Sequence, residues 1–219
     1  MRINKLIAHR LGISRRKADE FIEKGRVQVN KMPARSGQDI EDPAIILLDG
    51  KPLPDEKELI TVLMNKPEGY VCSRNGQGSH TVYELLPSNL RYLNIVGRLD
   101  KDSGGLLIFT NDGVLHNDLT HPSKQKEKTY EVSLNKVIED EDMKKLTSIG
   151  IELRDGLSKF IVKKSGISPT SYTIILKEGR NRQIRRTFNA LGYKITLLRR
   201  QAIADYSIDN LKIGEFKII

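Results

Sequence analysis

The sequence predicts an α+β protein in which a small helix-helix-hairpin domain precedes a larger domain of strands and helices. The chain has 219 residues, a length that suits one large or two small domains. Residues 1–50 carry two amphipathic helical patterns and then strand-like alternation. Residues 51–58 are polar and contain two prolines, which is typical of a linker. Apolar strand-like runs recur from residue 59 to residue 219, where we expect the second domain.

The charge balance favours a polyanionic partner. The formal net charge is +9 and the pI is about 9.5, so we expect nucleic acid before a membrane, with general solubility charge as the alternative. The N-terminus carries no apolar signal region, and no stretch reaches the length of a membrane span. The one cysteine, Cys72, is typical of a small core residue in a reducing compartment. We expect a cytoplasmic protein with no membrane contact, and a monomer.

The first fifty residues predict two helices and a hairpin. Apolar side chains recur on one helical face over residues 3–11. Ser14 is a suitable N-cap for a second helix over residues 15–24. Strict alternation predicts a strand at 27–29, and a second short strand is expected at 45–48.

Basic side chains gather around the second predicted helix. They are Arg10, Arg15, Arg16, Lys17, Lys24 and Arg26. Such a cluster can neutralise phosphates without reading the base sequence, and the alternative is a solvated helix face. Residues 14–19 and 25–30 resemble the S4 RNA-binding domain, in a likeness that covers residues 2–50. That resemblance implies that the cluster binds RNA.

The larger domain alternates strand-like and helical segments. Apolar or alternating runs predict strands at 59–64, from 71 onward, at 106–109, at 128–134, as a pair within 151–167, and at 171–177, 197–203 and 214–219. Helical patterns and caps predict helices at 82–86, 114–119, 138–149 and 181–191. The glycine pair at 104–105 allows a positive φ or the close approach of another chain segment.

The loop before the predicted strand at 106–109 is dense in charge. It contains Arg98, Asp100, Lys101 and Asp102. A strand directly after the loop would hold a carboxylate in a fixed position. Asp100 has three interpretations: a solvated turn carboxylate, a calcium ligand, or a nucleophile or base. The calcium interpretation fails because Gly104 falls where the third ligand of an EF-hand loop belongs.

Residues 97–113 favour the third interpretation through a resemblance. The order Gly-Arg-Leu-Asp-x-x-Ser-x-Gly-Leu-Leu, followed by Thr-x-Asp-Gly, resembles the catalytic segment of RNA pseudouridine synthases of the RsuA, RluB and RluF type. It implies that Asp100 is the catalytic aspartate, required to detach a uracil from its ribose before the base turns over and is rejoined through carbon. It also implies that Arg98 helps to hold the target nucleotide out of its stack, and we expect Leu99 to line the same substrate site.

Tyr130 lies on the alternating strand predicted at 128–134. It shares one face of that strand with Val132 and Leu134, so a core aromatic is one interpretation. The Lys-Thr-Tyr segment at 128–130 also resembles the second motif of the same family. By that resemblance Tyr130 packs against the flipped base and assists proton removal.

The last predicted helix carries an apolar stripe and several arginines. At 100° per residue, Arg185 lies beside Phe188 at the edge of the stripe, which makes it the arginine best placed to reach a half-buried acid. Residues 178–186 resemble the third family motif. The resemblance implies that Arg185 pairs with Asp100 and that Ile184 lines the pocket.

Three further arginines stand in the same segment, Arg180, Arg182 and Arg186. Four arginines within seven residues make a merely solvated helix face the weaker alternative. The resemblance implies that all three hold phosphates of an RNA strand, with Arg182 forming part of the substrate site.

No cofactor and no metal are expected. The glycine-containing loop at 74–80 lacks the Gly-Lys-Ser/Thr ending of a P-loop, so ATP binding is not predicted. His116 and His121 stand five residues apart, which is not a metal-ligand spacing on a helix, and no cysteine or clustered carboxylate joins them.

The resemblance covers nearly the whole chain and implies isomerisation of uridine in RNA by a domain with a mixed, mainly antiparallel sheet. Such an enzyme must flip its target base into a pocket, which is easiest where the base is already unpaired. Residues 65–69, 72–75 and 81–87 resemble the RluB type, which implies 23S large-subunit ribosomal RNA, free or in a pre-ribosomal particle, as the partner. The alternatives are 16S small-subunit ribosomal RNA and a non-catalytic ribosome assembly factor. The sequence leaves open whether Asp100 attacks the ribose, attacks the uracil or abstracts a sugar proton.

Overall fold

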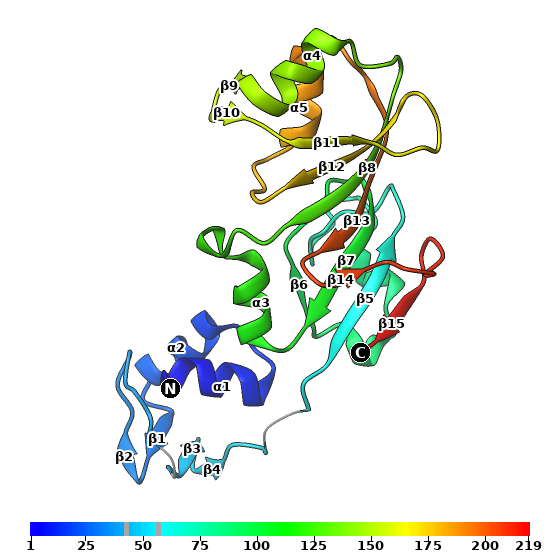
Figure 1. Cartoon of the computed structure of the whole chain (residues 1–219). Helices are drawn as coiled ribbons and strands as arrows, with labels where there is room; N and C mark the ends of the chain where they lie inside the picture. The colour runs from blue at the N-terminus through cyan, green and yellow to red at the C-terminus, as the bar shows by residue number, and fades with distance from the viewer. Residues whose placement is uncertain (42–43, 56–57) are drawn as a thin grey trace. The chain divides into compact units, whose positions relative to one another are not determined.

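The computed structural model describes residues 1–41, 44–55 and 58–219 of the chain. The chain divides into two compact units, Met1–Leu59 and Ile60–Ile219 (Figure 1). Each unit has its own hydrophobic core. Both units combine helices and strands, so the predicted α+β class is confirmed. In the part of the chain that the structure describes, no helix is long and apolar enough to cross a membrane.

The first unit packs two helices against a small sheet. Helix α1 (Ile3–Leu11) ends at Gly12 in the left-handed conformation, and helix α2 (Arg15–Glu23) begins where the Ser14 hydroxyl accepts a hydrogen bond from the Lys17 amide at 3.1 Å. The antiparallel strands of its sheet are β1 (Val27–Val29), β2 (Met32–Pro33), β3 (Ile46–Leu48) and β4 (Lys51–Pro52). Apolar residues of both helices and of the strands form one core, which includes Ile3, Ile7, Ala18, Ile22, Val27, Ile46 and Leu53.

The first residues of the predicted linker belong to the fold of this unit. Lys51 and Pro52 form β4 beside β3, and the Leu53 side chain is buried in the core. Composition alone predicts a linker here, because one leucine between two prolines gives no periodic pattern. Glu56 and Lys57 of the predicted linker lie outside the described residues, and the boundaries 1–50, 51–58 and 59–219 stay a prediction.

The second unit is built on one mixed sheet in which antiparallel pairs dominate. The strand order is β11-β12-β8-β13-β7-β5-β15, with β6 beside β7 and β14 beside β13, and the central strands lie side by side in Figure 1. Of these neighbours, β13 and β7 run parallel and the others antiparallel. The strands are β5 (Thr61–Lys66), β6 (Asn94–Val96), β7 (Gly104–Thr110), β8 (Lys128–Leu134), β11 (Ile161–Lys164), β12 (Ser171–Leu176), β13 (Ile195–Ile203), β14 (Tyr206–Ser207) and β15 (Phe216–Ile218).

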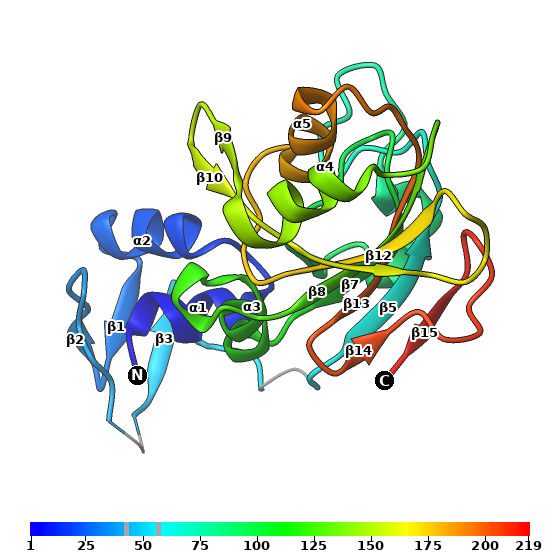
Figure 2. The same ribbon diagram turned by 45° about the horizontal axis from the view of Figure 1, so that its top comes forward.

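Helical segments cover this sheet at three places. Helix α5 (Gln183–Ala190) and the consecutive helices α4 (Asp140–Lys144) and η4 (Lys145–Ile149) pack over β8 and β12 (Figure 2). Helix α3 (Gly113–Thr120) packs on one face of β5 and β7, and the 3₁₀ turns η1 (Val82–Leu85) and η2 (Ser88–Leu90) pack on the other. A further turn, η3 (Pro122–Lys124), follows α3, and β9 (Ile151–Leu153) forms a separate hairpin with β10 (Gly156–Ser158).

Two of the expected helices form differently. The expected helix at 138–149 begins as α4 at Asp140 and continues as the π-helical η4, in which the Gly150 amide bonds to the Lys145 carbonyl at 2.7 Å. The expected helix at 82–86 is the 3₁₀ turn η1, because Pro87 disfavours a helical conformation of the residue before it.

Gly105 brings two strands close together. Its φ is +98°, and a Cβ atom at this position would lie 2.2 Å from the Arg200 carbonyl oxygen and 2.5 Å from the Arg200 nitrogen. Both uses expected of the glycine pair, positive φ and close approach, therefore meet at this residue. The parallel pairing of β7 with β13 depends on the contact.

We expect Gly105→Ala to destabilise the protein by about 3 kcal/mol, since the methyl group meets backbone atoms and the φ is unfavourable. Urea denaturation followed by circular dichroism measures the change. Gly113→Ala is the matched control, because nothing lies within 4 Å of its Cβ position and the residue begins α3. Equal stability of the two variants would contradict the role given to Gly105.

Candidate active site

A cleft of about 800 Å³ opens in the second unit where the sheet meets the segment that leads into α5. Its walls come from the loop before β7, from β8 and β13, and from residues 176–185. The residues expected to be catalytic or to bind substrate all border it: Arg98, Leu99, Asp100, Tyr130, Arg182, Ile184 and Arg185. Since these segments are far apart in sequence, tertiary structure assembles the set.

The loop that carries Asp100 is held through its backbone. The Ser103 amide donates to the Asp100 carbonyl at 3.1 Å, and the Leu99 amide lies 3.4 Å from the Cys72 sulfur. Leu99 and Ser103 are buried, whereas 29% of the Asp100 side chain is exposed. Burial raises the pKa of the Cys72 thiol, in keeping with its expected role as a small core residue. The loop therefore presents the Asp100 carboxylate to the cleft from an anchored main chain.

Lys66 binds the backbone of this loop from the end of β5. It was not among the expected site residues. It is the last residue of β5 and is completely buried. Its Nζ donates to three carbonyl oxygens, those of Pro67 at 3.0 Å, Asp100 at 3.2 Å and Ser103 at 2.7 Å. Burial lowers the pKa of Lys66. Lys66 lies in the segment 65–69 that resembles the RluB type, but nothing in the sequence indicated that the lysine points inward.

Arg182 is the arginine that reaches Asp100. Its Nη1 lies 3.3 Å from Asp100 Oδ2, and its two terminal nitrogens donate to the two carboxylate oxygens of Asp102 at 2.9 Å. The hydrogen bond from Arg182 is the main cause that lowers the pKa of Asp102, and the same bond raises the pKa of Arg182. One guanidinium therefore links both acids of the loop.

The expected pairing of Arg185 with Asp100 is wrong for this structure. Arg185 Nη2 donates to the Asp102 carbonyl at 2.5 Å and to the Ser103 hydroxyl at 3.1 Å. A spacing of 100° per residue treats Arg182 as a residue within the helix. Instead it is the N-cap residue of α5, with a left-handed φ of 45°, which directs it to the loop.

Arg180 and Arg186 both bind groups of the protein in this structure, and their expected role with phosphates stays a prediction. Arg186 donates to both carboxylate oxygens of Asp155, at 2.8 and 2.7 Å. Arg180 Nη1 donates to the carbonyl oxygens of Asp155 and Gly156 at 2.9 and 2.8 Å. Asp155 lies between β9 and β10, so both arginines fasten this hairpin to the segment that carries Arg182.

Tyr130 and Ile184 form apolar walls of the cleft. They are 9% and 6% exposed and belong to one core cluster with Leu99 and Leu198. The Tyr130 phenol makes no hydrogen bond to another residue that the structure describes. Tyr130 is thus both a core aromatic and a cleft residue, and the two interpretations are compatible. The flat Tyr130 ring, with its polar hydroxyl group, suits a planar ligand such as a nucleobase.

Arg98 lies at the exposed rim of the cleft. Its side chain makes no ion pair or hydrogen bond with the rest of the described chain. Arg98 is therefore available to a ligand, whereas Arg182 and Arg185 already bind groups of the loop.

The basic residues expected to bind RNA in the first unit differ in how far their charge is neutralised. Arg26 Nε donates to Asp49 at 2.9 Å, and its guanidinium lies 4.4 Å from the Phe21 ring centre. Lys17 pairs with a glutamate at 2.7 Å, and Arg15 donates to an asparagine at 3.2 Å. Within the described residues, ion pairs and side-chain hydrogen bonds are absent from Arg10, Arg16 and Lys24.

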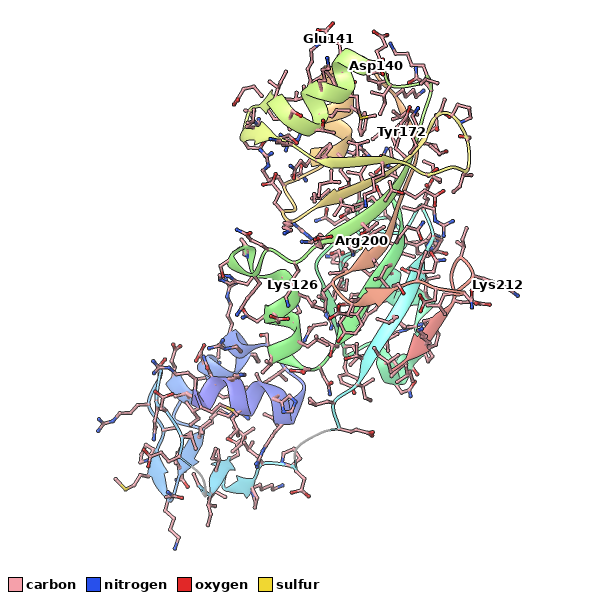
Figure 3. The ribbon with its side chains drawn as sticks, in the orientation of Figure 1. Lys126, Asp140, Glu141, Tyr172, Arg200 and Lys212 are labelled. Atoms are coloured by element: carbon pink, nitrogen blue, oxygen red, sulfur yellow. The ribbon has the colours of Figure 1, made fainter. Side chains whose placement is uncertain are left out.

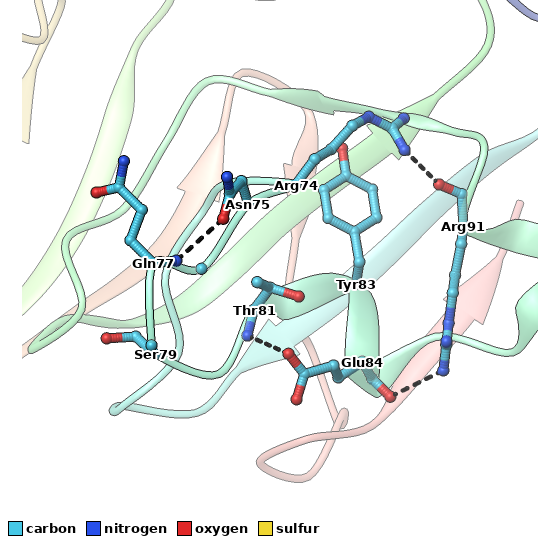
Figure 4. Close-up of a pocket in the computed structure, with 10 residues that line it drawn as sticks. Arg74, Asn75, Gln77, Ser79, Thr81, Tyr83, Glu84 and Arg91 are labelled. Carbon is cyan, nitrogen blue, oxygen red and sulfur yellow. Dashed lines mark hydrogen bonds between the residues drawn. The ribbon is translucent and has the colours of Figure 1, made fainter.

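A second pocket of about 580 Å³ lies beside the glycine-containing loop at 74–79 (Figure 4). Arg74 donates to the carbonyl groups of residues 91, 92 and 93 and lies 4.4 Å from the Tyr83 ring centre. Figure 4 also shows Glu84 bound to the Thr81 amide and, through its carbonyl, to Arg91. These polar groups stabilise the loop rather than face a ligand. No group of His, Cys, Asp or Glu side chains that could hold a metal ion occurs among the described residues.

Comparison with known proteins gives consistent matches over both units. The sequence pattern of RNA pseudouridylate synthases matches residues 60–190, and that of the S4 domain matches residues 1–41. The ribosomal large subunit pseudouridine synthase B of Vibrio cholerae is 36% identical over 220 residues, which cover 95% of this chain and 68% of that protein. The ribosomal small subunit pseudouridine synthase A of Salmonella typhimurium is 34% identical over 99% of this chain and 95% of its own length. A crystal structure of a pseudouridylate synthase, 30% identical, superposes with a TM-score of 0.69 over the whole of this chain and 96% of that one.

The ion pairs of Asp155 predict an acid-dependent contribution to stability. Hydrogen bonds from Arg186 are the main cause that lowers the pKa of Asp155 from 3.8 to about 2. A carboxyl group with a lowered folded-state pKa stabilises the fold above its unfolded pKa and loses that effect as the pH falls toward the folded value. We expect Asp155→Asn to lower the melting temperature by a small amount near neutral pH, because the pair is exposed.

The difference between wild type and Asp155→Asn should shrink as the pH falls from 3.8 toward about 2, when thermal melts are recorded by circular dichroism. Glu152→Gln on the same hairpin is the control, since Glu152 makes no ion pair in the described chain. A pH-independent difference for Asp155→Asn would contradict the assignment.

Proposed function

The chain belongs to the RNA pseudouridylate synthase family, and we propose that it isomerises uridine to pseudouridine in ribosomal RNA with Asp100 as the catalytic residue. The observation that carries the proposal is the meeting of Asp100, Tyr130 and Ile184 in one cleft. A carboxylate beside the Tyr130 ring and the apolar Ile184 side chain suits a uridine whose ribose lies near the acid and whose base packs on these side chains. Binding alone would require no such combination, which disfavours a non-catalytic assembly factor.

The reaction changes the bonds of one nucleotide and leaves its composition unchanged. The bond from C1′ of the ribose to N1 of uracil breaks, the ring turns over, and C5 bonds to C1′. C5 then loses a proton and N1 gains one. Asp100 acts on the ribose or on the ring in the first step, and Tyr130 supports the base and assists removal of the C5 proton. The loop contacts of Lys66, Arg182 and Arg185 fix Asp100 for this step.

The target base must leave its stack to enter the cleft. Flipping costs a few kcal/mol and is least unfavourable for an unpaired base, so we propose loops of structured RNA as targets. The exposed Arg98 at the rim is placed to occupy the space that the base leaves. The S4 domain and its basic residues bind the RNA backbone and supply affinity without reading sequence.

We propose 23S ribosomal RNA as the substrate, on the likeness of the loop segments to the RluB type. A relative named for the large subunit and another named for the small subunit have similar sequence identity to this chain, 36% and 34%. The second candidate substrate is therefore 16S RNA. The protein would act in the cytoplasm, where ribosomal RNA is assembled into subunits. We propose that it acts as a monomer.

Asp100→Asn should keep the fold and the RNA affinity but lower pseudouridine formation by about 10³-fold or more, since the carboxylate takes part in bond breaking. The measurement is incubation with 23S and 16S transcripts, followed by carbodiimide labelling and primer extension to map pseudouridine. A stop in one transcript that the variant lacks identifies both the activity and the substrate subunit.

Normal product formation by Asp100→Asn would overturn the assignment of this residue. No product from the wild-type protein, on either transcript or on precursor subunits, would favour the assembly-factor alternative. The variant's thermal melt serves as the control for folding.

The basic residues of the first unit differ in their protein partners, so we expect their removal to change the salt dependence of RNA affinity to different extents. Arg16→Ala should weaken binding to ribosomal RNA fragments and reduce the slope of log affinity against log salt by about 1, as expected for one lost phosphate contact. Arg26→Ala is the matched control and should change the slope less, because Asp49 already neutralises Arg26. Fluorescence anisotropy over a salt series measures both. Equal changes for the two variants would contradict the proposal.

A further inference from the structure

Arg200 is a buried cation that the reaction described above does not use. It lies on β13, borders the cleft and is 2% exposed (Figure 3). Its Nε donates to the Leu106 carbonyl at 2.9 Å, while its Nη2 is buried without a hydrogen-bond partner. No carboxylate of the described chain lies within ion-pair distance of its guanidinium. The structure therefore retains a buried positive charge with no anion beside it.

Lys128 adds a second cation at the same place. It begins β8 and also borders the cleft, and its Nζ donates to the Lys126 carbonyl at 3.1 Å. Lys126 has its own partner, Asp118 at 2.7 Å, whereas Lys128 has no such acid among the described residues. Burial lowers the pKa of Lys128, and the nearby charge of Arg200 lowers it further.

Two neighbouring cations without a counterion are unfavourable for folding. A buried charge that lacks a partner costs several kcal/mol, and removal of buried ionic groups often leaves stability unchanged or improves it. Cations retained under these conditions suit a negative charge that develops on the substrate during the reaction. The cleft would then be incomplete, in electrostatic terms, until that charge develops.

The sheet places Arg200 beside Tyr130, the side chain on which the base is proposed to pack. Arg200 and Tyr130 are directly opposed residues of β13 and β8, and both border the cleft. Opposed residues of neighbouring strands have Cβ atoms about 5 Å apart and project to the same face. A uracil ring that packs on Tyr130 is therefore within reach of the field of Arg200. A backbone phosphate fits less well, because it stays hydrated and prefers exposed cations such as Arg98.

We propose that Arg200, together with Lys128, forms a cationic wall that stabilises the negative charge of the uracil ring while it is detached from the ribose. The inference rests on the proposed function. When the bond from C1′ to N1 breaks, its electron pair passes to N1 and is delocalised onto the ring oxygens. The charge disappears when C5 bonds to C1′, C5 loses its proton and N1 is protonated. Since the bound uridine is neutral at the ring, the wall favours the reacting state over the ground state.

Arg200→Met should slow single-turnover pseudouridine formation by at least about tenfold, as expected when electrostatic stabilisation is removed from a water-poor site. Its affinity for the RNA should be unchanged. Arg199→Met is the matched control and should react at the wild-type rate. Arg199 neighbours Arg200 on β13, points to the other face, donates to Asn65 at 2.9 Å, and does not border the cleft.

RNA with 5-fluorouridine at the target position separates an electrostatic role from a structural one. Fluorine withdraws electrons and stabilises the ring anion by itself, so Arg200→Met should lose less rate in consuming 5-fluorouridine than in converting uridine. Equal losses with both nucleotides would assign Arg200 to structure alone and overturn the inference. If Arg200→Met does not fold, Arg200→Lys and Arg200→Gln replace it, and the charged variant should keep the larger rate.

The remaining outcomes separate this inference from the proposed function. No product from the wild-type protein overturns the proposed function and the inference with it. Product from the wild type, with equal rates for Arg200→Met and Arg199→Met, overturns the inference alone. A weaker RNA affinity of Arg200→Met at an unchanged single-turnover rate would assign Arg200 to phosphate binding and also overturn it.

Discussion

The buried ammonium group of Lys66 is the interaction on which the geometry of the cleft depends. A charged group can be buried only if its donors are satisfied, and here the carbonyls of Asp100 and Ser103 in the loop, together with that of Pro67, satisfy them. Lys66 ends a strand that is buried on both faces, so its own position is fixed by the sheet. The loop is thereby tied to a buried strand of the sheet. The contacts of Arg182 and Arg185 with Asp102 and Ser103 then hold it from the other side.

Lys66 also lies in a row of paired strand residues that includes Arg200, the main residue of the proposed cationic wall. Lys66 is paired with Gly105, Gly105 with Arg200, and Arg200 with Tyr130 across four neighbouring strands. Gly105 lacks the side chain that would separate its neighbours, and this permits the close approach of the Arg200 backbone. The residue that anchors the Asp100 loop and the residues proposed to face the base therefore belong to one row of paired strand residues. Their spacing is set by strand geometry, which varies less than that of loops.

Sequence patterns predicted the elements and the membership of the cleft, but not which charges pair within it. Strand and helix periodicity depends on near neighbours, so the strands around Asp100 and Tyr130 and the helix beginning near residue 183 could be predicted. The partner of Asp100 depended on the left-handed conformation of Arg182, which a helical wheel cannot represent. Arg180 and Arg186 are fastened to Asp155, whose proximity follows from tertiary packing. The burial of Lys66 was equally hidden, because a lysine at a strand end is normally exposed.

Composition alone would assign the basic residues of the chain to RNA binding. Two of them, Lys128 and Arg200, instead border the cleft. Substrate and product of a uridine isomerisation have the same composition and charge, so a site gains nothing by binding either one more tightly. It can accelerate the reaction only through groups that stabilise the charge that develops while substrate is converted to product. A carboxylate fixed through its neighbours' backbone and a cationic wall without an internal anion are groups of this kind. On that reasoning, the unpaired charge of Arg200 is better explained by the reaction than by the stability of the fold, which it lowers.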